Sequence, residues 1–306
     1  MIGENEKYLS YSGFLNIIKP PGITSFGVVA RVKELTGERR VGHGGTLDPD
    51  ATGVLPVALG QATRLIEYFA DATKLYHTEI ELGVATDTYD ASGNVVSKKD
   101  SSGVNREMVE NALASFGGVI QQVPPMYSAL RHNGRRLYKL AREGISVERP
   151  PREAHVYHIE LIAFDNPFLT IDVECGKGTY IRSIANDLGE KLGVGACMKG
   201  LTRLRVGPFD IKDGASLVEL EEACRHGFFR RYIDAPDTVL LQHNAAVIGF
   251  DKEDAIRKGQ KVALDIKSSL VSCNILRSYS LDGRFIGIIS YDSETARWQP
   301  EKVFNS

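Results

Sequence analysis

The sequence predicts an α+β fold, in which a mixed, mostly antiparallel sheet is followed by a small β-rich C-terminal domain. Strand and helix patterns follow one another without the regular β-α alternation that is typical of a parallel sheet. The chain has 306 residues, which exceeds the usual size of one hydrophobic core. Because its character changes after about residue 242, we expect one domain over residues 1–241 and a second over residues 242–306.

The N-terminal region predicts a strand followed by a helix. Residues 14–18 form a short apolar run, which a Lys-Pro-Pro-Gly sequence ends. Thr24 or Ser25 can then cap a helix that stops at Gly37. The apolar residues along one face of this helix are Val28, Val29, Val32 and Leu35.

Two patterns in the next part of the chain predict strands of different kinds. Residues 54–58 are continuously apolar, as in a buried strand, and Pro56 favours an edge position or a bulge. Residues 74–82 alternate in polarity, so that Tyr76 shares the inward face with Thr78. An inward tyrosine is most often a core residue, so Tyr76 alone does not indicate a site.

The middle of the chain predicts two strands, a helix and another strand. Residues 156–164 and 168–174 have strand patterns, and a Gly-Lys-Gly-Thr turn then leads into a helix with Arg182 in its first turn. A cation at a helix N-terminus is disfavoured by the helix dipole, so we expect a negative group to hold Arg182 there. A strand over residues 201–206 would place on one face Leu201, Arg203 and Arg205.

The last elements are short. Ser216 and Glu219 form a capping-box sequence for a helix that runs to about residue 226. Residues 255–262 predict a short helix, a turn and the start of a strand, and Asp282-Gly283 predicts a hairpin turn. These elements favour a small β-rich module at the C-terminus.

The composition is that of a soluble globular protein, with 42% hydrophobic and 25% charged residues. No apolar run has the length of a membrane span, and the polar segment 1–7 lacks the features of a signal peptide. The cysteines form no C-x-x-C pair, so neither a zinc site nor a disulfide framework is expected. We therefore expect a cytoplasmic protein with reduced thiols at Cys175, Cys197, Cys224 and Cys273.

Motifs of several enzyme classes are absent from the sequence. The Gly-Lys-Gly-Thr segment at 176–179 lacks the Walker spacing, which argues against nucleotide hydrolysis. There is no H-E-x-x-H sequence and no G-x-S-x-G elbow. We therefore expect no metal site and no α/β-hydrolase.

Basic residues are concentrated in one stretch although the net charge of the chain is only −2. Between residues 131 and 152 the acidic residues are Glu143 and Glu148. The basic residues there are Arg131, Arg135, Arg136, Lys139, Arg142, Arg149 and Arg152. A solvated face explains such a run as well as contacts with nucleic-acid phosphates do.

A glycine-rich loop carries the most informative acidic residue. Asp48 lies just before a proline in the sequence Gly-His-Gly-Gly-Thr-Leu-Asp-Pro, which begins at Gly42. Glycines permit close backbone approach and unusual dihedral angles around a carboxylate. A tight turn with a capping aspartate is the simpler explanation of this segment by itself.

Five motifs, in this order, closely resemble the TruB family of tRNA pseudouridine synthases. They are Lys-Pro-Pro-Gly-Ile-Thr-Ser at 19–25, the glycine-rich loop at 42–49, Lys-Leu-Tyr at 74–76, Gln-Val-Pro-Pro-Met-Tyr-Ser-Ala at 122–129 and Gly-Thr-Tyr-Ile-Arg-Ser at 178–183. The resemblance covers about the first 210 residues and, in outline, the rest. It implies a catalytic domain of pseudouridine synthase type and a PUA-like, RNA-binding C-terminal domain.

The resemblance implies an enzyme that converts uridine-55 in the T-loop of tRNA to pseudouridine. The uridine is flipped out of the loop, and no metal or organic cofactor is needed. Asp48 matches the catalytic aspartate of the family, which attacks C1′, attacks the base or removes a ribose proton. Arg182 matches the arginine that pairs with this aspartate. Alternatives are a tRNA-folding, RNA-binding protein whose catalysis is secondary, and a guide-RNA-dependent synthase that needs partner proteins.

The resemblance also implies roles around the flipped base. Tyr76 matches a ring that stacks on the uracil, and His43 matches the residue that fills the space left in the RNA. Tyr180 and Leu201 match residues that pack around the uracil. Lys19 and Pro20 belong to a supporting motif.

The basic stretch corresponds in this family to a thumb-like insertion that clamps RNA, here at about residues 124–152. The implied contacts with the RNA backbone are Arg131, Arg135, Arg136 and Lys139. The sequence of this stretch fits the stand-alone bacterial form of the enzyme. The expected partner is therefore the T-arm stem-loop of tRNA, with no membrane, no obligatory protein partner and a monomeric chain.

Overall fold

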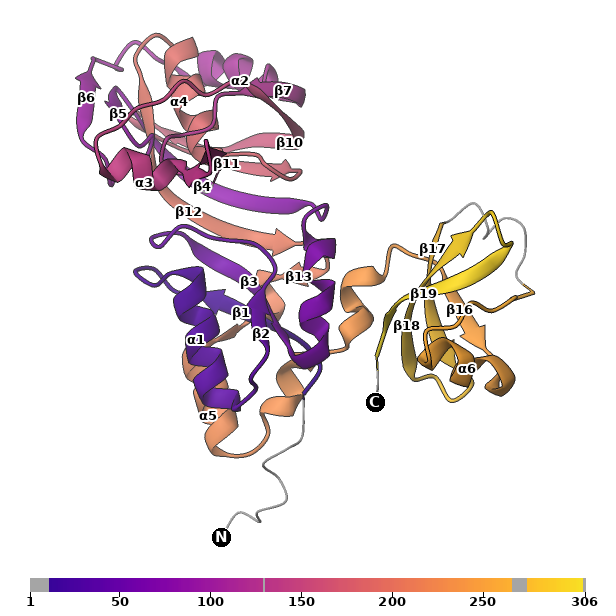
Figure 1. The fold of residues 1–306 in the computed structure, drawn as a ribbon. Coiled ribbons are helices and arrows are strands. Elements are labelled where there is room, and N and C mark those ends of the chain that lie inside the picture. The colour runs from indigo at the N-terminus through magenta and orange to yellow at the C-terminus, as the bar shows by residue number, and fades with distance from the viewer. Residues whose placement is uncertain (1–10, 129, 266–273, 305–306) are drawn as a thin grey trace.

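The computed structural model describes residues 11–128, 130–265 and 274–304, which form two large β-sheets with helices around them (Figure 1). The polar segment 1–7, Ala129 of the fourth motif and Cys273 lie outside the described residues. The other three cysteines are free thiols. Within the described ranges, no helix is long and apolar enough to cross a membrane.

The larger sheet has eleven strands and belongs to the first domain. Its main path runs β14-β1-β3-β12-β4-β11-β10-β7, and β2, β13 and β15 attach to it. Among its described pairings, β1–β14 and β3–β12 are parallel and the others are antiparallel, which confirms the predicted mixed, mostly antiparallel sheet. The strand bounds are β1 (Gly13–Lys19), β2 (Val41–His43), β3 (Thr52–Leu59), β4 (Lys74–Leu82), β7 (Gly118–Gln122), β10 (Arg152–Asp165), β11 (Phe168–Cys175), β12 (Ala196–Val206), β13 (Phe209–Asp210), β14 (Ala215–Ser216) and β15 (Ile233–Asp234).

Strand β12 joins the two halves of this sheet. It pairs with β4 along its length but with β3 only through Thr202 and Arg203. Figure 1 shows α1 and α5 beside the half that contains β1 and β3, and α2 and α4 beside the half that contains β10 and β11. Each half buries its own apolar core. The helix bounds are α1 (Ser25–Thr36), α2 (Arg106–Ala114), α4 (Ile181–Lys191) and α5 (Leu217–Arg225), with 3₁₀ helices η2 (Gly60–Phe69), η3 (Ile211–Asp213), η4 (Phe229–Tyr232) and η5 (Pro236–Leu240).

The capping signals of α1 and α5 act as predicted. Of the two candidates for the α1 cap, the structure selects Thr24, whose hydroxyl accepts the N–H of Gly27 at 2.9 Å. Gly37 ends α1 in the left-handed conformation (φ 70°). Ser216 and Glu219 form both hydrogen bonds of a capping box at the start of α5.

Pro56 lies in a strand with neighbours on both sides, so the predicted edge position or bulge is wrong. On one side β3 pairs with β1 without a register shift. On the other side β3 pairs with β12 at residues 52–53 and with β2 at residues 57–59. The carbonyl of Pro56 accepts the N–H of Gly44 at 2.8 Å, and the proline nitrogen faces the gap between β12 and β2, where no ladder hydrogen bond is lost.

A β-bulge in β12 changes the predicted alternation. Arg203 lies opposite Tyr76 of β4, whereas Arg205 lies opposite Leu75. Because Leu75 and Tyr76 are adjacent, their side chains point to opposite faces. The prediction that Arg203 and Arg205 share a face is therefore wrong. Arg203 is 1% exposed, and Arg205 forms an ion pair with Glu174 at 2.7 Å on the other face.

The chain between β7 and β10 forms a small subdomain of its own. A short hairpin precedes one helix, and a local core is built from Met126, Leu137 and Leu140. The elements are β8 (Arg131–His132), β9 (Arg135–Arg136) and α3 (Leu137–Arg142). A second hairpin, β5 (Val84–Thr86) with β6 (Val95–Lys98), follows β4.

The C-terminal domain contains the second sheet, in the order β16-β17-β18-β19. Asp282 and Gly283 lie in the turn between β17 and β18, as predicted. Helix α6 begins at Phe250, earlier than predicted, and Val262 forms only an isolated bridge with Trp298, so the strand predicted there is wrong. The bounds are β16 (Ala245–Ile248), α6 (Phe250–Arg257), β17 (Ile275–Ser280), β18 (Phe285–Asp292) and β19 (Arg297–Val303).

Candidate active site

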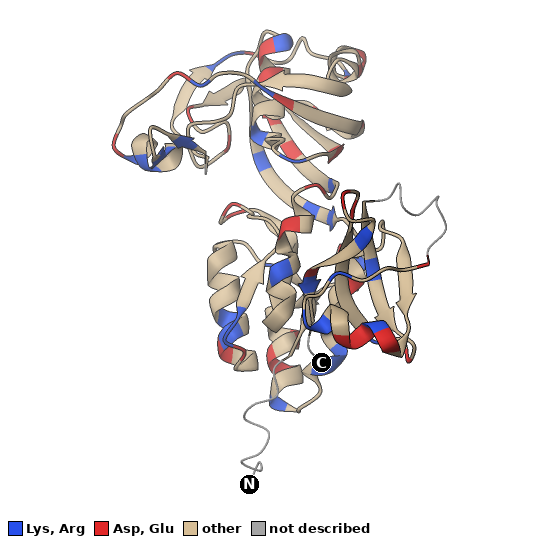
Figure 2. Cartoon of the chain, turned by 45° about the vertical axis from the view of Figure 1, so that its right-hand side comes forward, with Lys and Arg blue, Asp and Glu red and all other residues tan. Residues whose placement is uncertain are grey.

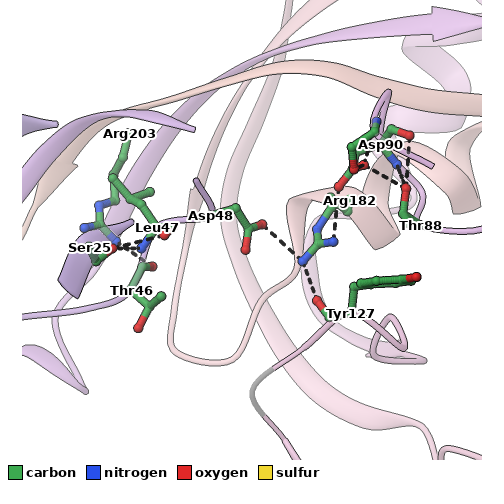
Figure 3. A network of polar contacts seen from close by, with 10 residues as sticks. Ser25, Thr46, Leu47, Asp48, Thr88, Asp90, Tyr127, Arg182 and Arg203 are labelled. Atoms are coloured by element: carbon green, nitrogen blue, oxygen red, sulfur yellow. Dashed lines mark hydrogen bonds and ion pairs between the residues drawn. The ribbon is translucent and has the colours of Figure 1, made fainter. Parts of the chain in front are cut away.

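Asp48 lies in the loop between β2 and β3, close to the junction of the two halves of the sheet (Figure 3). Ser25 at the start of α1 holds the preceding residue, because its hydroxyl donates to the Leu47 carbonyl at 3.0 Å and accepts the Leu47 N–H at 2.8 Å. The loop is thus fixed to α1 through its backbone. The side chain of Asp48 is 46% exposed, so it remains open to a substrate.

Lys19 holds the other end of the loop. It is fully buried at the end of β1, and its ammonium donates to the carbonyls of Pro20, Ile23 and Pro49 at 2.8, 2.7 and 2.6 Å. Burial lowers the pKa of Lys19, and nearby aspartates oppose this shift. Lys19 therefore supports Pro49, the residue that follows Asp48, and its ammonium also holds the carbonyl of the exposed Pro20.

Arg182 joins three segments that are far apart in the sequence (Figure 3). Its guanidinium is almost buried, with 8% of the side chain exposed. One nitrogen lies 3.1 Å from Asp48 Oδ2 and donates to the Tyr127 carbonyl at 2.7 Å, and the other lies 3.1 Å from Asp90 Oδ2. The negative group expected at this helix N-terminus is therefore a pair of carboxylates.

Asp90 is a site residue that the sequence reasoning missed. Its second carboxylate oxygen accepts hydrogen bonds from the hydroxyls of Thr88 and Ser92 at 2.7 and 2.5 Å. These two bonds fix the orientation of the Asp90 carboxylate independently of its contact with Arg182. Tyr89 adopts a left-handed conformation (φ 66°) between them. The spacing of Thr88, Asp90 and Ser92 is typical of a polar turn, but nothing in that pattern indicates a partner 92 residues away.

The pKa of Asp48 is raised above its ordinary value. Partial burial is the largest cause, the charge of Asp90 acts in the same direction, and the adjacent Arg182 guanidinium opposes both. One cation is shared by two carboxylates, so Arg182 does not fully compensate the charge of Asp48. The site therefore holds a carboxylate that takes up a proton more readily than an exposed aspartate does.

Tyr76 and Leu201 lie on neighbouring strands near the loop. Tyr76 is partly buried against the core of the α2–α4 half, and Leu201 of β12 packs against the same core. Burial raises the pKa of the Tyr76 hydroxyl, and the guanidinium of Arg203, opposite Tyr76 in β12, acts against this rise. Arg203 is a second residue that the function prediction did not include.

Tyr180 is fixed through its backbone at the start of α4. The side chain of Gln122, buried at the end of β7, accepts the Tyr180 N–H at 3.0 Å and donates to the Tyr180 carbonyl at 3.2 Å. Burial raises the pKa of the Tyr180 hydroxyl, which Ser128 and Arg182 oppose. Gln122 belongs to the fourth motif, so its position links that motif to the fifth.

His43 ends β2 on the near side of the glycine-rich loop. Its Nδ1 accepts the N–H of Gly45 at 3.4 Å, and burial together with the charge of Arg203 lowers its pKa. The ring is therefore neutral at pH 7. Because the ring is half-buried, part of it remains accessible beside the loop that carries Asp48.

Figure 2 colours the Lys and Arg residues of the chain blue along the ribbon. Those of the insertion that are predicted to contact RNA are exposed, and they differ in how they are paired. Arg135 donates to both carboxylate oxygens of Glu143 at 2.5 and 2.6 Å. Arg131 donates to the Gly134 carbonyl at 3.3 Å. For Arg136 and Lys139, no ion pair is found within the ranges that the structure describes.

The arrangement as a whole offers an accessible carboxylate with a buried guanidinium beside it, the Tyr76 ring on β4 and the Tyr180 ring at the start of α4. An ionised carboxylate in this position can act as a nucleophile or as a base. In the described parts of the chain, no group of three or more His, Cys, Asp or Glu residues could hold a metal ion.

Models of known families match two adjacent parts of the chain. The model described as TruB family pseudouridylate synthase (N terminal domain) matches residues 33–181. The model described as tRNA pseudouridylate synthase B C-terminal domain matches residues 182–241. The first match contains Asp48 and Tyr76, and the second begins at Arg182.

Proteins named tRNA pseudouridine synthase B are similar over nearly the whole chain. The protein from Dehalococcoides mccartyi strain 195 is 47% identical over 96% of this chain and 97% of its own length. The protein from Clostridium perfringens strain SM101 is 42% identical over 92% of this chain and 96% of its own length. Among solved structures, a chain of a Cbf5-Nop10-Gar1 complex has a TM-score of 0.73 at 27% identity, covering 96% of this chain and 85% of that one. This chain therefore belongs to the TruB family of pseudouridylate synthases.

Proposed function

We propose that this enzyme isomerises uridine-55 in the T-loop of tRNA to pseudouridine. The supporting observation is the Asp48–Arg182 ion pair at 3.1 Å, in which the arginine is buried and the carboxylate stays accessible. In the reaction, the bond between N1 of uracil and C1′ breaks, and a bond between C5 and C1′ forms. C5 loses a proton and N1 gains one, so no oxidant, reductant or cofactor is consumed.

Asp48 is the catalytic residue in this proposal. Attack on C1′, attack on the base and removal of a ribose proton all need the ionised carboxylate. Arg182 favours this form, and its contacts with Asp90 and Tyr127 prevent it from turning away.

The uridine must leave the T-loop to reach Asp48, which costs a few kcal/mol. Stacking on an aromatic ring contributes about 1–3 kcal/mol per base, and Tyr76 is the ring proposed for it. Tyr180 and Leu201 would line the remaining sides of the uracil. His43, neutral and half-accessible, would occupy the space that the base leaves in the RNA.

The insertion at residues 124–152 would bind the T-arm stem-loop, with contacts from Arg131, Arg135, Arg136 and Lys139 to the RNA backbone. We also propose that residues 1–241 are the catalytic domain and residues 242–306 a PUA-like RNA-binding domain. The chain would act as a monomer without an obligatory protein partner. A tRNA substrate favours a cytoplasmic location.

Tritium release from C5-labelled uridine tests this function. The purified chain should release tritium from an unmodified tRNA transcript, and substitution of cytidine at position 55 of the transcript should abolish release. Release that persists from the substituted transcript would contradict the assigned uridine. Tight binding without release would favour the RNA-binding, tRNA-folding alternative or the need for a partner.

A further inference from the structure

Arg203 is the largest charged side chain buried in the sheet. It is 1% exposed, and no carboxylate lies within ion-pair distance of it in the described parts of the chain. Burying an unpaired charge is costly unless its donors are hydrogen-bonded. Its burial must therefore be offset by hydrogen bonds from its guanidinium.

The guanidinium donates three hydrogen bonds to backbone carbonyls in and beside the Asp48 loop. Arg203 Nε donates to Val54 at 2.8 Å, and its two terminal nitrogens donate to Gly45 at 3.0 Å and to Thr46 at 3.5 Å. Along this edge of β3, residues 52–53 pair with β12 and residues 57–59 pair with β2. Val54 lies between these two pairings, and the Arg203 guanidinium bonds to its carbonyl there. It thereby ties the start of the loop to the strand that ends it.

The backbone of Arg203 is held as firmly as its side chain. β3 approaches so closely that a Cβ on Gly53 would lie 2.2 Å from the Arg203 carbonyl oxygen, and Gly53 has φ 98°. On its other side Arg203 lies directly opposite Tyr76 in β4. Burial raises the pKa of Tyr76 and lowers that of His43, and the nearby charge of Arg203 opposes the first shift and adds to the second.

We propose that Arg203 is a positioning residue for the reaction, which sets the Asp48 loop relative to the Tyr76 ring across β12. This inference rests on the proposed roles of Asp48 and Tyr76. The loop belongs to one half of the sheet and the ring to the other, and Arg203 is the side chain that contacts the loop from the strand beside the ring. Its planar fork reaches several carbonyls at once, which a lysine ammonium on a flexible stem cannot reproduce.

The test compares Arg203→Lys with wild type in single-turnover pseudouridine formation and in tRNA binding, per folded enzyme. Because small misplacements in an active site can cost about 100-fold in rate, we expect a loss of about 10–100-fold in rate. The dissociation constant for tRNA should stay within about threefold, since the change acts on the chemical step. Arg205→Lys, two residues along the same strand and paired with Glu174, is the matched control and should behave like wild type.

A positioning role also predicts a shifted acid limb of the pH–rate profile for Arg203→Lys, because the Asp48–Arg182 geometry changes. A purely structural role would lower the folded fraction and leave the limb and the rate per folded enzyme unchanged. That result, or equal losses in rate and binding, would overturn the proposal. Arg203→Gln is the second variant, and failure of both variants to fold would replace positioning by a fold-determining role.

Asp48→Asn, measured in parallel, separates this inference from the proposed function. If wild type itself forms no pseudouridine in tRNA, the proposed function fails. If wild type is active, Asp48→Asn is inactive and Arg203→Lys equals wild type, only the positioning role is refuted.

Discussion

At the scale of single residues, the candidate active site places two carboxylates against one buried guanidinium. Arg182 carries one positive charge and contacts both Asp48 and Asp90 at 3.1 Å. Asp90 is fixed by two hydroxyls, whereas Asp48 has one charged partner and a half-exposed side chain. The carboxylate that is least compensated is therefore the more exposed one, Asp48, which is the one proposed to act on the substrate.

The raised pKa of Asp48 predicts an acid limb in the rate of pseudouridine formation. In the proposed reaction the ionised carboxylate is the active form, so the single-turnover rate should fall as the pH falls through this pKa. An ordinary exposed aspartate has a pKa of about 3.9. Because the pKa of Asp48 is raised, the midpoint of the acid limb should lie above this value. A pH–rate profile measured with a pre-bound tRNA checks this, and a midpoint at or below the ordinary value would contradict it.

The same shift predicts that Asp48→Asn does not destabilise the fold. The folded state binds the Asp48 proton more tightly than the unfolded chain does, so ionisation of Asp48 costs stability at pH values above its folded pKa. Asparagine removes that cost, and Arg182 keeps Asp90 and the Tyr127 carbonyl as partners. The free energy of unfolding at pH 7 should equal or exceed that of wild type. A clearly lower value in urea denaturation would argue that the ion pair stabilises the fold.

At the scale of elements, local signals and the mostly antiparallel character of the sheet were predictable, whereas the pairing of individual strands was not. The ends of α1 and α5 follow from the capping residues Thr24, Gly37 and Ser216, because these act within one turn of chain. Pro56 was misplaced, since its nitrogen faces a gap between two partner strands that come from distant segments. The bulge after Arg203 likewise depends on the pairing with β4, which sequence alternation does not contain.

The capping box of α5 gives a prediction at this scale. Ser216→Ala should lower the free energy of unfolding by about 1 kcal/mol, because the hydroxyl that accepts the Glu219 N–H is lost. Ser216→Gly should cost only a few tenths of a kcal/mol, since glycine is tolerated at a helix N-cap. Urea denaturation of both variants checks this order. The rate of tritium release at 25 °C should stay at the wild-type level in each, and equal stability of the two variants would contradict the capping role.

At the scale of the whole molecule, the site depends on contacts that no single motif contains. Asp48 comes from one half of the sheet, Tyr76 from the other, and the Tyr127 carbonyl from the base of the insertion. The five ordered motifs predicted Asp48, Tyr76 and Arg182 through their resemblance to a family. Asp90, Gln122 and Arg203 were missed, because their roles depend on tertiary contacts with residues distant in the sequence.

The exposed charges of the insertion predict how tRNA binding depends on salt. Arg136→Gln should weaken binding and reduce the slope of log K against log salt by roughly one, if its guanidinium contacts one phosphate. Arg106→Gln is the matched control, because Arg106 is an exposed arginine on α2, outside the insertion, that pairs with Glu110. Binding constants at several salt concentrations check this. An unchanged slope for Arg136→Gln would identify the basic stretch as a solvated face.

The most direct test of the account compares Asp48→Asn with Asp50→Asn in tritium release from C5-labelled tRNA. Asp50 is an exposed aspartate in the same loop, so it controls for the loss of one negative charge there. We predict that Asp48→Asn releases no tritium while binding tRNA within a few-fold of wild type, and that Asp50→Asn retains release. Release by Asp48→Asn, or a loss of binding as large as its loss of rate, would contradict the assignment of Asp48 as the catalytic residue.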